Sequence, residues 1–371
     1  MKRRTFIRMA ACTSVAAAAT ACSTISTRSD LSRVPGCSKP SGGGDARIRG
    51  AFPILSTPYR ESGEVDFQTL AEEAKFVDKC GCDGAIWPQS GDSCDLLTLD
   101  EKLAGMEAMA KALENSQTVA TFGCQGRDFG EAKECAKKVK ELSSKYRINA
   151  AIISRPPDNG KTEEDLEKYY IGLSETVDCP IIIQTGGGVL YKGVAPSVGL
   201  LERLARKNPK SFGYIKEESG NSNSRMAEEI AKKPVIHTVF SAWGSYQWLY
   251  QSRRIGSEGV ISERVAYADV LAEIWRLMEL RDSSGRLDDA FSKYLLMINI
   301  SEFVPGSLRG GHLYVLRKRG VFKNLLSREY DRKNGKDTIP DKPILRELKL
   351  SQAQIDEIET RFANLSPYLS V

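Results

Sequence analysis

Short apolar runs alternate with longer amphipathic segments along most of the chain. Folded structure is expected to begin near Ile48, and from there runs rich in β-branched and other apolar residues are separated by stretches with helical periodicity. This alternation is typical of βα units that build a parallel sheet. Eight runs can be counted: Gly50–Thr57, Gly84–Ser90, Thr118–Gly123, Ala150–Pro156, Pro180–Gly186, Gly213–Ser219, Val235–Ala242 and Glu258–Glu263. They predict an α/β fold in which residues 48–268 form a closed (β/α)₈ barrel.

The segments between these runs have the period of surface helices. Residues 66–80 place apolar side chains on one face: Phe67, Leu70, Ala74 and Val77. Further along, Thr98 precedes Glu101 in the spacing of a capping box, which predicts that a helix begins there.

After the eighth run, residues 269–371 show mainly helical periodicity, with a polar segment at residues 334–341. The helical stretches are Leu271–Leu280, Ala290–Asn299 and Ala353–Phe362. We expect a helical C-terminal extension that packs on the barrel.

The N-terminus is typical of an export signal. The basic residues 2–8 contain the pair Arg3-Arg4, and the Ala-rich residues 10–21 follow. Residues 1–22 are therefore interpreted as a twin-arginine signal, and the Ser- and Gly-rich residues 23–47 as a flexible tether. Cys22 is a candidate for lipidation, and simple cleavage after a small-residue site is the alternative. The predicted location is periplasmic, either free or anchored by a lipid.

Composition excludes several other classes of function. Removing residues 1–22 takes away four basic side chains and no acidic one, so the formal net charge falls from +5 to +1. A nearly neutral chain without basic runs interleaved with aromatics does not fit a nucleic-acid binder. Apolar runs long enough to span a bilayer are absent. Seven cysteines remain, without a CxxC pair, so free thiols are favoured over a zinc site or a disulfide framework.

One basic residue lies in an apolar context. Lys216 comes near the end of the sixth run, whose flanking residues are largely apolar. Burial disfavours a charged amine, and a neutral amine is the form that attacks a ketone to give an iminium. The alternative is a structural lysine that forms a salt bridge with Glu217 or Glu218, although a regular strand would place Glu217 on the opposite face.

Several segments resemble the dihydrodipicolinate synthase and N-acetylneuraminate lyase family. The matching motifs are Thr57-Pro58-Tyr59, Gly63-Glu64-Val65-Asp66, Gly81-Cys82-Asp83-Gly84, Lys216-Glu217-Glu218-Ser219-Gly220 and Gly256-Ser257-Glu258-Gly259-Val260-Ile261-Ser262. The resemblance implies a Schiff-base lysine at Lys216 and a 2-oxo acid as the small-molecule substrate. It also implies no cofactor or metal, and assembly into homodimers or homotetramers. From the last motif, Ile261 is assigned to substrate binding.

The chain also departs from the family pattern. Pro88-Gln89-Ser90-Gly91-Asp92 replaces the family's Gly-Thr-Thr-Gly-Glu, so Gln89, Ser90 and backbone amides are the candidates for binding a substrate carboxylate, unless the segment merely shapes a loop. Gln184 stands where the family has a relay tyrosine, and an amide cannot shuttle a proton near neutral pH. The second relay tyrosine is also missing. Gln184 is retained as a substrate-binding candidate.

Arg155 ends the fourth run, and it is either a bidentate partner for a substrate carboxylate or an exposed loop arginine.

Two functions follow from these residues. The first is a Schiff-base lyase or aldolase acting on a 2-oxo acid through Lys216. The alternative is an exported binding or regulatory protein for a small carboxylate or sugar acid on a degenerate barrel, and reaction of Lys216 with a 2-oxo acid distinguishes the two.

The export signal makes a testable prediction. Replacing Arg3 and Arg4 together with lysine should leave uncleaved precursor in the cytoplasm, because the twin-arginine route requires the arginine pair. Fractionation followed by immunoblotting measures the result. Delivery of mature protein at the wild-type level would exclude this route.

Overall fold

The computed structural model describes residues 48–371 except 93, 126–128, 187–192, 243–244 and 300–309. The predicted export signal, with Cys22, and the predicted tether lie outside the described residues. Within the described residues, no helix is both long and apolar enough to cross a membrane.

Eight parallel strands form the centre of the fold. They are β1 (Gly50–Pro53), β2 (Gly84–Trp87), β3 (Val119–Gly123), β4 (Asn149–Ser154), β5 (Ile181–Gln184), β6 (Tyr214–Lys216), β7 (Thr238–Phe240) and β8 (Gly259–Ser262). Neighbours pair in chain order from β2 to β7, and β1 pairs with β8. Bridges from Ile54 to Ile86 and from Ser241 to Val260 join the two sheets. All eight predicted strands are confirmed, and the sheet closes into a barrel.

The interior of the barrel is apolar below its C-terminal end. Nine strand-associated side chains form one buried cluster there: Phe52, Ile54, Ile86, Ala151, Ile153, Ile182, Tyr214, Phe240 and Ile261. Successive side chains on a strand alternate between faces, so Tyr214 and Lys216 both point inward while Ile215 packs in the outer core against the helices. Lys216 therefore lies one step above this apolar layer, toward the strand ends.

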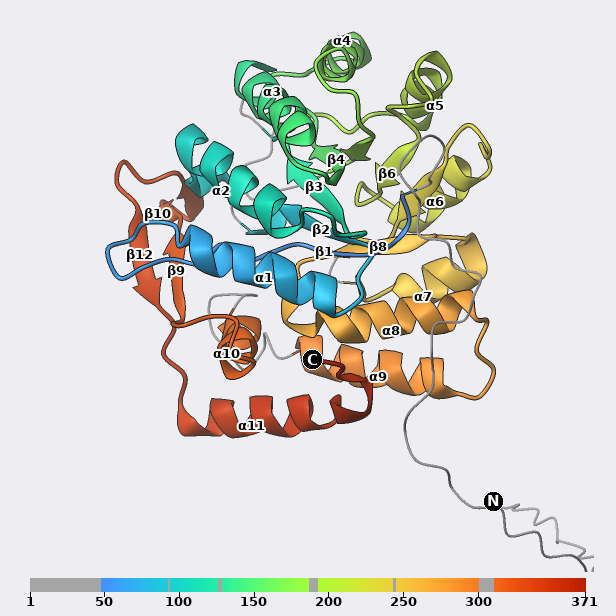
Figure 1. Cartoon of the computed structure of the whole chain (residues 1–371). Helices are drawn as coiled ribbons and strands as arrows, with labels where there is room; N and C mark the ends of the chain where they lie inside the picture. Colours follow the sequence, from blue (N-terminus) through green and yellow to red (C-terminus); the bar gives the residue numbers. More distant parts are fainter. Residues whose placement is uncertain (1–47, 93, 126–128, 187–192, 243–244, 300–309) are drawn as a thin grey trace, which may run out of the picture. The chain divides into compact units, whose positions relative to one another are not determined.

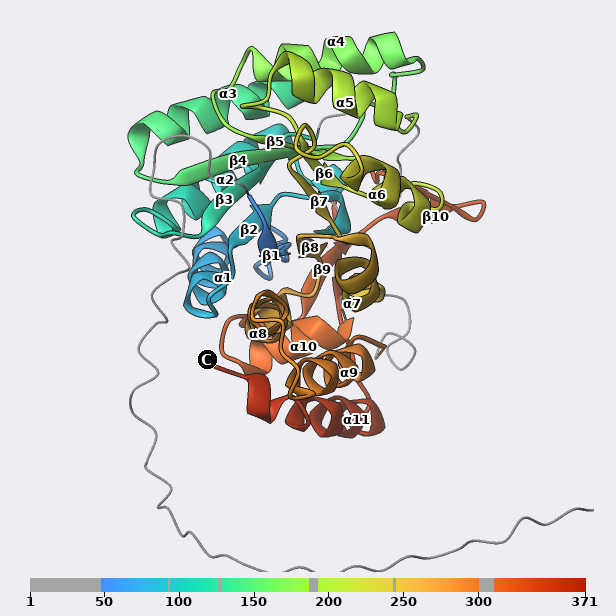
Figure 2. The same cartoon turned by 90° about the vertical axis from the view of Figure 1, so that its right-hand side faces the viewer.

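Helices surround the barrel on its outer face (Figures 1 and 2). They are α1 (Phe67–Lys79), α2 (Leu99–Ala112), α3 (Phe129–Lys145), α4 (Glu163–Ser174), α5 (Val198–Lys207), α6 (Ser222–Ile230), α7 (Trp248–Tyr250) and α8 (Ala268–Glu279). The predicted capping box of Thr98 and Glu101 is present at the start of α2. Because α8 contacts β1, the eighth βα unit extends into the range assigned to the C-terminal extension.

The extension contains strands as well as helices. Helices α9 (Arg286–Ile298), α10 (Gly310–Lys318) and α11 (Gln352–Ala363) gather beside α8 (Figure 2). Between α10 and α11, β9 (Leu326–Glu329) pairs with β12 (Ile344–Glu347), and β10 (Asp331–Lys333) with β11 (Lys336–Thr338). The expectation of a mainly helical extension with a polar segment was therefore incomplete, because that part of the chain also contains strands. These short strands are half-exposed and polar, so they lack the apolar alternation that marks a buried strand.

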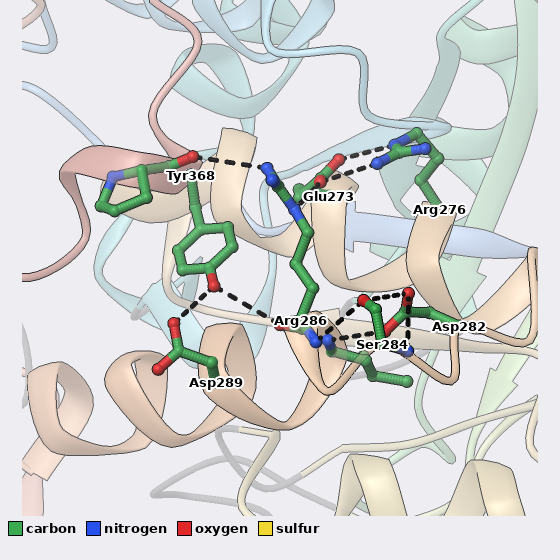
Figure 3. A network of polar contacts seen from close by, with 9 residues as sticks. Glu273, Arg276, Asp282, Ser284, Arg286, Asp289 and Tyr368 are labelled. Carbon is green, nitrogen blue, oxygen red and sulfur yellow. Dashed lines mark hydrogen bonds and ion pairs between the residues drawn. The ribbon is translucent and has the colours of Figure 1, made fainter. Parts of the chain in front are cut away.

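Polar contacts fasten the end of the chain to α8 and α9. Arg286 donates hydrogen bonds to Glu273 and to the carbonyl of Pro367, and the Tyr368 hydroxyl donates to Asp289 (Figure 3). Arg319 in addition pairs with Asp269 on α8, with 2.6 Å between its Nη2 and a carboxylate oxygen. The extension is thus attached to the barrel by charged contacts as well as by its apolar faces.

The six cysteines of the described part of the chain are free thiols, as predicted: Cys80, Cys82, Cys94, Cys124, Cys135 and Cys179. Burial raises the pKa of Cys80 and of Cys94 to about 12. A buried thiol of this kind is unreactive near neutral pH.

The contact between α2 and β2 makes a stability prediction. A Cβ added at Gly105 would lie 2.2 Å from ring atoms of Trp87, whose side chain is fully buried. Gly105→Ala should therefore lower the free energy of unfolding by about 1–3 kcal/mol, although alanine favours helices. Gly199→Ala in α5 is the matched control, because its Cβ would approach other atoms no closer than 3.7 Å. It should be neutral or stabilising by up to about 1 kcal/mol. Chemical denaturation would show whether the two substitutions differ in sign.

Candidate active site

Lys216 ends β6 inside the barrel and forms an ion pair. Its side chain is 6% exposed, and its Nζ lies 3.0 Å from Oε2 of Glu218, which is 7% exposed. Residues two apart on an extended chain share a face, so Glu218 follows Lys216 into the interior. Glu217 points to the other face, as predicted, and accepts a hydrogen bond from Arg225 of α6. Lys216 therefore forms a salt bridge with Glu218 and not with Glu217.

The Glu218 carboxylate is fixed by neighbours on β5. Its Oε1 accepts a hydrogen bond from Nε2 of Gln184, the last residue of β5. Its backbone N–H donates to Oγ1 of Thr185 over 2.9 Å, and that hydroxyl in turn lies 3.3 Å from the carbonyl oxygen of Lys216. One carboxylate oxygen therefore faces Lys216 while the other is held by Gln184.

Three buried glutamines meet at the C-terminal ends of β2, β3 and β5. Oε1 of Gln184 accepts hydrogen bonds from Nε2 of Gln89 at 2.6 Å and from Nε2 of Gln125 at 2.8 Å. Nε2 of Gln184 donates to Oγ of Ser90 at 3.0 Å, in addition to Glu218. An amide has two donors and two acceptor lone pairs, so Gln184 is fully engaged. It positions its neighbours, and it has no hydrogen-bonding capacity left for a substrate.

Sequence reasoning missed Gln125. This residue follows β3 by two positions and is 2% exposed. A polar residue immediately after a strand of a (β/α)₈ barrel lies at the face where such barrels carry their chemistry, and that position is the signal that would have identified it.

The loop after β2 uses its backbone amides internally. The N–H of Ser90 donates to Oε1 of Gln125, the N–H of Gly91 to Oε1 of Gln89, and the N–H of Asp92 to the Gln89 carbonyl. The expectation that these amides hold a substrate carboxylate is therefore wrong for this structure. Gln89 is hydrogen-bonded through one N–H and one lone pair of its side-chain amide, and its assignment to substrate binding stays a prediction. The Ser90 hydroxyl accepts from Gln184 and can still donate, so Ser90 remains a substrate-binding candidate.

Arg155 is neither a free carboxylate clamp nor an exposed loop arginine. Its side chain is 1% exposed, and its two terminal nitrogens lie 2.9 and 3.3 Å from the carboxylate oxygens of Asp95. Asp95 lies in the segment between β2 and α2. The sequence pattern did not predict that this segment reaches the end of β4. Because the bidentate face of the guanidinium is already occupied, Arg155 stabilises the strand ends rather than offering a vacant clamp.

Ile261 of β8 belongs to the apolar layer inside the barrel, together with Tyr214 and Phe240. Its assignment to substrate binding stays a prediction. The structure places this residue in an apolar layer, one step below Lys216. Bulk water poorly screens the charge of a lysine above such a layer, and this strengthens the electrostatic interaction of Lys216 with Glu218.

A second buried carboxyl group lies behind β6. Glu229 of α6 is fully buried beside Glu217, and Nη2 of Arg225 lies 3.8 Å from its Oε1. Burial, with the neighbouring Glu217 carboxylate, raises the pKa of Glu229 to about 10. Glu229 is therefore protonated at neutral pH, and Arg225 pairs with Glu217, with 3.2 Å between its Nε and Oε2 of Glu217.

Comparisons with known proteins identify the family of this chain. The family model described as "Dihydrodipicolinate synthetase family" matches residues 47–294. A 4-hydroxy-tetrahydrodipicolinate synthase from Chlorobium chlorochromatii is 27% identical over 282 residues, which cover 74% of this chain and 89% of the relative. The corresponding enzyme from Haloarcula marismortui is 27% identical over 176 residues, or 47% of this chain, and this chain spans only 54% of that relative's length.

Solved structures are similar in fold. The sialic acid aldolase of Ruminococcus gnavus aligns with a TM-score of 0.68 at 15% identity, covering 87% of this chain and 99% of the aldolase. Dihydrodipicolinate synthase from Aquifex aeolicus aligns with a TM-score of 0.67 at 18% identity, covering 87% and 100%. At these identities the likeness concerns the fold alone.

The raised pKa of Glu229 predicts a pH-dependent stability. Below the carboxyl's ordinary pKa of 4.5 both the folded and the unfolded state hold the proton, so this group does not change the free energy of unfolding with pH. As the pH rises toward about 10, the unfolded state releases the proton while the folded state keeps it, so the folded state loses stability. Glu229→Gln should remove this loss and be more stable than wild type at pH 9, but not at pH 4.

Urea denaturation across this pH range measures the difference. Glu114→Gln, the same change at an exposed glutamate that follows α2, is the control and should leave the wild-type pH dependence unaltered. Parallel pH profiles for Glu229→Gln and wild type would contradict the assignment of a protonated Glu229.

Proposed function

Because the chain belongs to the dihydrodipicolinate synthetase family, we propose that it is a lyase that forms a Schiff base with a 2-oxo acid through Lys216. The observation that carries the proposal is the position of Lys216: a buried lysine at the C-terminal end of a barrel strand, where (β/α)₈ barrels place their reacting groups. Buried lysines are rare, and this one has an acidic partner that can take a proton from it.

The chemistry follows from an amine in that position. The neutral amine attacks the ketone carbon of the 2-oxo acid, water leaves, and a positively charged iminium remains on Nζ. The iminium withdraws electrons from the adjacent bonds, so a neighbouring carbon–carbon bond can be broken or made. Cleavage, addition and dehydration share this intermediate, and the proposal therefore concerns the covalent intermediate rather than one of these outcomes.

The departures at the strand ends bear on the reaction type. Gln184 occupies the place of the family's relay phenol, and its amide cannot exchange a proton near neutral pH. We therefore propose a reaction different from that named for the synthase relatives. We also propose export through the signal at residues 1–22, with Cys22 as the candidate site of lipidation, and assembly into a homo-oligomer.

Covalent trapping tests the proposal. Borohydride, added together with each member of a panel of 2-oxo acids that includes pyruvate, should attach the reduced acid to Lys216, as read by peptide mass. Lys216→Ala should form no adduct. It should also lose about 3–5 kcal/mol of stability, because it leaves the buried Glu218 without its counter-ion.

Lys216→Arg is the matched variant for the fold. Arginine keeps a positive charge beside Glu218 but stays protonated and cannot act as the nucleophile, so this variant should fold and form no adduct. If the wild type binds a 2-oxo acid reversibly and no member of the panel modifies Lys216, the lyase proposal is wrong. The protein would then be a binding protein for a small carboxylate.

A further inference from the structure

We propose that Glu218 is the catalytic acid and base of iminium formation, and that the three-glutamine cluster of Gln89, Gln125 and Gln184 positions it. This inference rests on the proposed function of Lys216. Because the family's relay phenol is missing, another group has to move protons at the reacting nitrogen.

Glu218 directly contacts the nitrogen that would react. Oε2 of Glu218 lies 3.0 Å from Nζ of Lys216, within the distance for direct proton transfer. Both side chains are almost completely buried, so bulk water competes poorly for that proton. The strand geometry explains the pairing, since the two residues are two positions apart and share the inner face of β6 and its extension.

Amides and hydroxyls make up the hydrogen-bond network around Glu218. Glu218 is hydrogen-bonded to Gln184 and Thr185, and Gln184 to Gln89, Gln125 and Ser90. Amides and hydroxyls do not titrate near neutral pH. Among these described side chains, the carboxylate of Glu218 is therefore the group able to accept a proton from Lys216 and return it.

The proton balance closes with this one carboxylate. In the resting pair Nζ carries three protons and Glu218 is ionised. Transfer of one proton from Nζ to Oε2 gives a neutral amine and a neutral acid. The amine attacks the ketone carbon, and a proton moves from nitrogen to the former carbonyl oxygen, which gives a neutral carbinolamine. Glu218 then protonates the departing hydroxyl, which leaves as water.

Glu218 ends this cycle as a carboxylate beside the iminium. The charges before and after are the same: one positive nitrogen and one negative carboxylate. The site therefore keeps its charge balance through the step, and the carboxylate stabilises the iminium electrostatically in a poorly solvated environment. No proton needs to come from a phenol.

The glutamines keep the carboxylate in place for this task. Because both lone-pair positions of the Gln184 oxygen are filled by Gln89 and Gln125, its amide nitrogen must face Glu218 and Ser90. Gln184 holds one oxygen of Glu218 and leaves the other directed at Nζ. Gln184 thus acts through Glu218 and is a positioning residue.

The test compares rates of adduct formation. Wild type, Glu218→Gln, Glu218→Ala and Glu217→Gln are each incubated with pyruvate and cyanoborohydride, and the Lys216 adduct is followed by intact mass. Glu218→Gln keeps the size of the side chain but cannot carry the proton, so its rate should fall about 100-fold or more. Glu217→Gln is the same substitution one position away, on the outer face, and should react at the wild-type rate.

Chemical rescue separates proton transfer from a structural role. Glu218→Ala should also react slowly, and added formate should accelerate it by occupying the vacated position, while leaving Glu218→Gln unchanged. A Glu218→Gln rate equal to or above that of wild type would overturn the proposal, because the carboxylate would then only hold the lysine in an ion pair. Failure of formate to accelerate Glu218→Ala would also overturn the acid–base role. Absence of any wild-type adduct with the whole panel of 2-oxo acids would instead overturn the proposed function itself.

Discussion

The buried contact between Lys216 and Glu218 is the interaction on which the rest of the site depends. Removing two charges from water is unfavourable, and the mutual attraction of a buried pair offsets this only when other hydrogen bonds complete the coordination of both groups. Here the second oxygen of Glu218 is hydrogen-bonded by Gln184, which two more glutamines hold. The polar cluster at the strand ends therefore makes a charged pair tolerable in the barrel interior.

The parallel barrel supplies the geometry for this arrangement. The carboxyl ends of its strands converge at one end, so β2, β3, β5 and β6 can each contribute one member of the same network. The alternation of side chains along β6 separates two neighbouring glutamates. Glu218 enters the interior with Lys216, while Glu217 lies with Arg225 and Glu229 outside the barrel. A shift of one residue in the register of β6 would exchange these roles.

The sequence predicted the barrel and its lysine well because both depend on local patterns. Buried parallel strands are short continuous apolar runs, and a lysine in such a run stands out. The contacts between distant segments were not predictable in this way. No local pattern indicates that Asp95 pairs with Arg155, or that the side chain of Gln125 accepts a hydrogen bond from the backbone N–H of Ser90. The hairpin of β10 and β11 did have a signal, since Asn334-Gly335 both adopt positive φ in a two-residue turn, but its polar strands concealed it.

We propose that Lys216 and Glu218 form one reacting unit at the mouth of the barrel. The direct test is a crystal structure of the protein after treatment with borohydride and a 2-oxo acid of the panel, beginning with pyruvate. We expect continuous electron density from Nζ of Lys216 to the second carbon of the reduced acid, with the Glu218 carboxylate still within hydrogen-bonding distance of that nitrogen. An unmodified Lys216 still paired with Glu218, after treatment with every 2-oxo acid of the panel, would show that the two residues form an ion pair and no reacting unit.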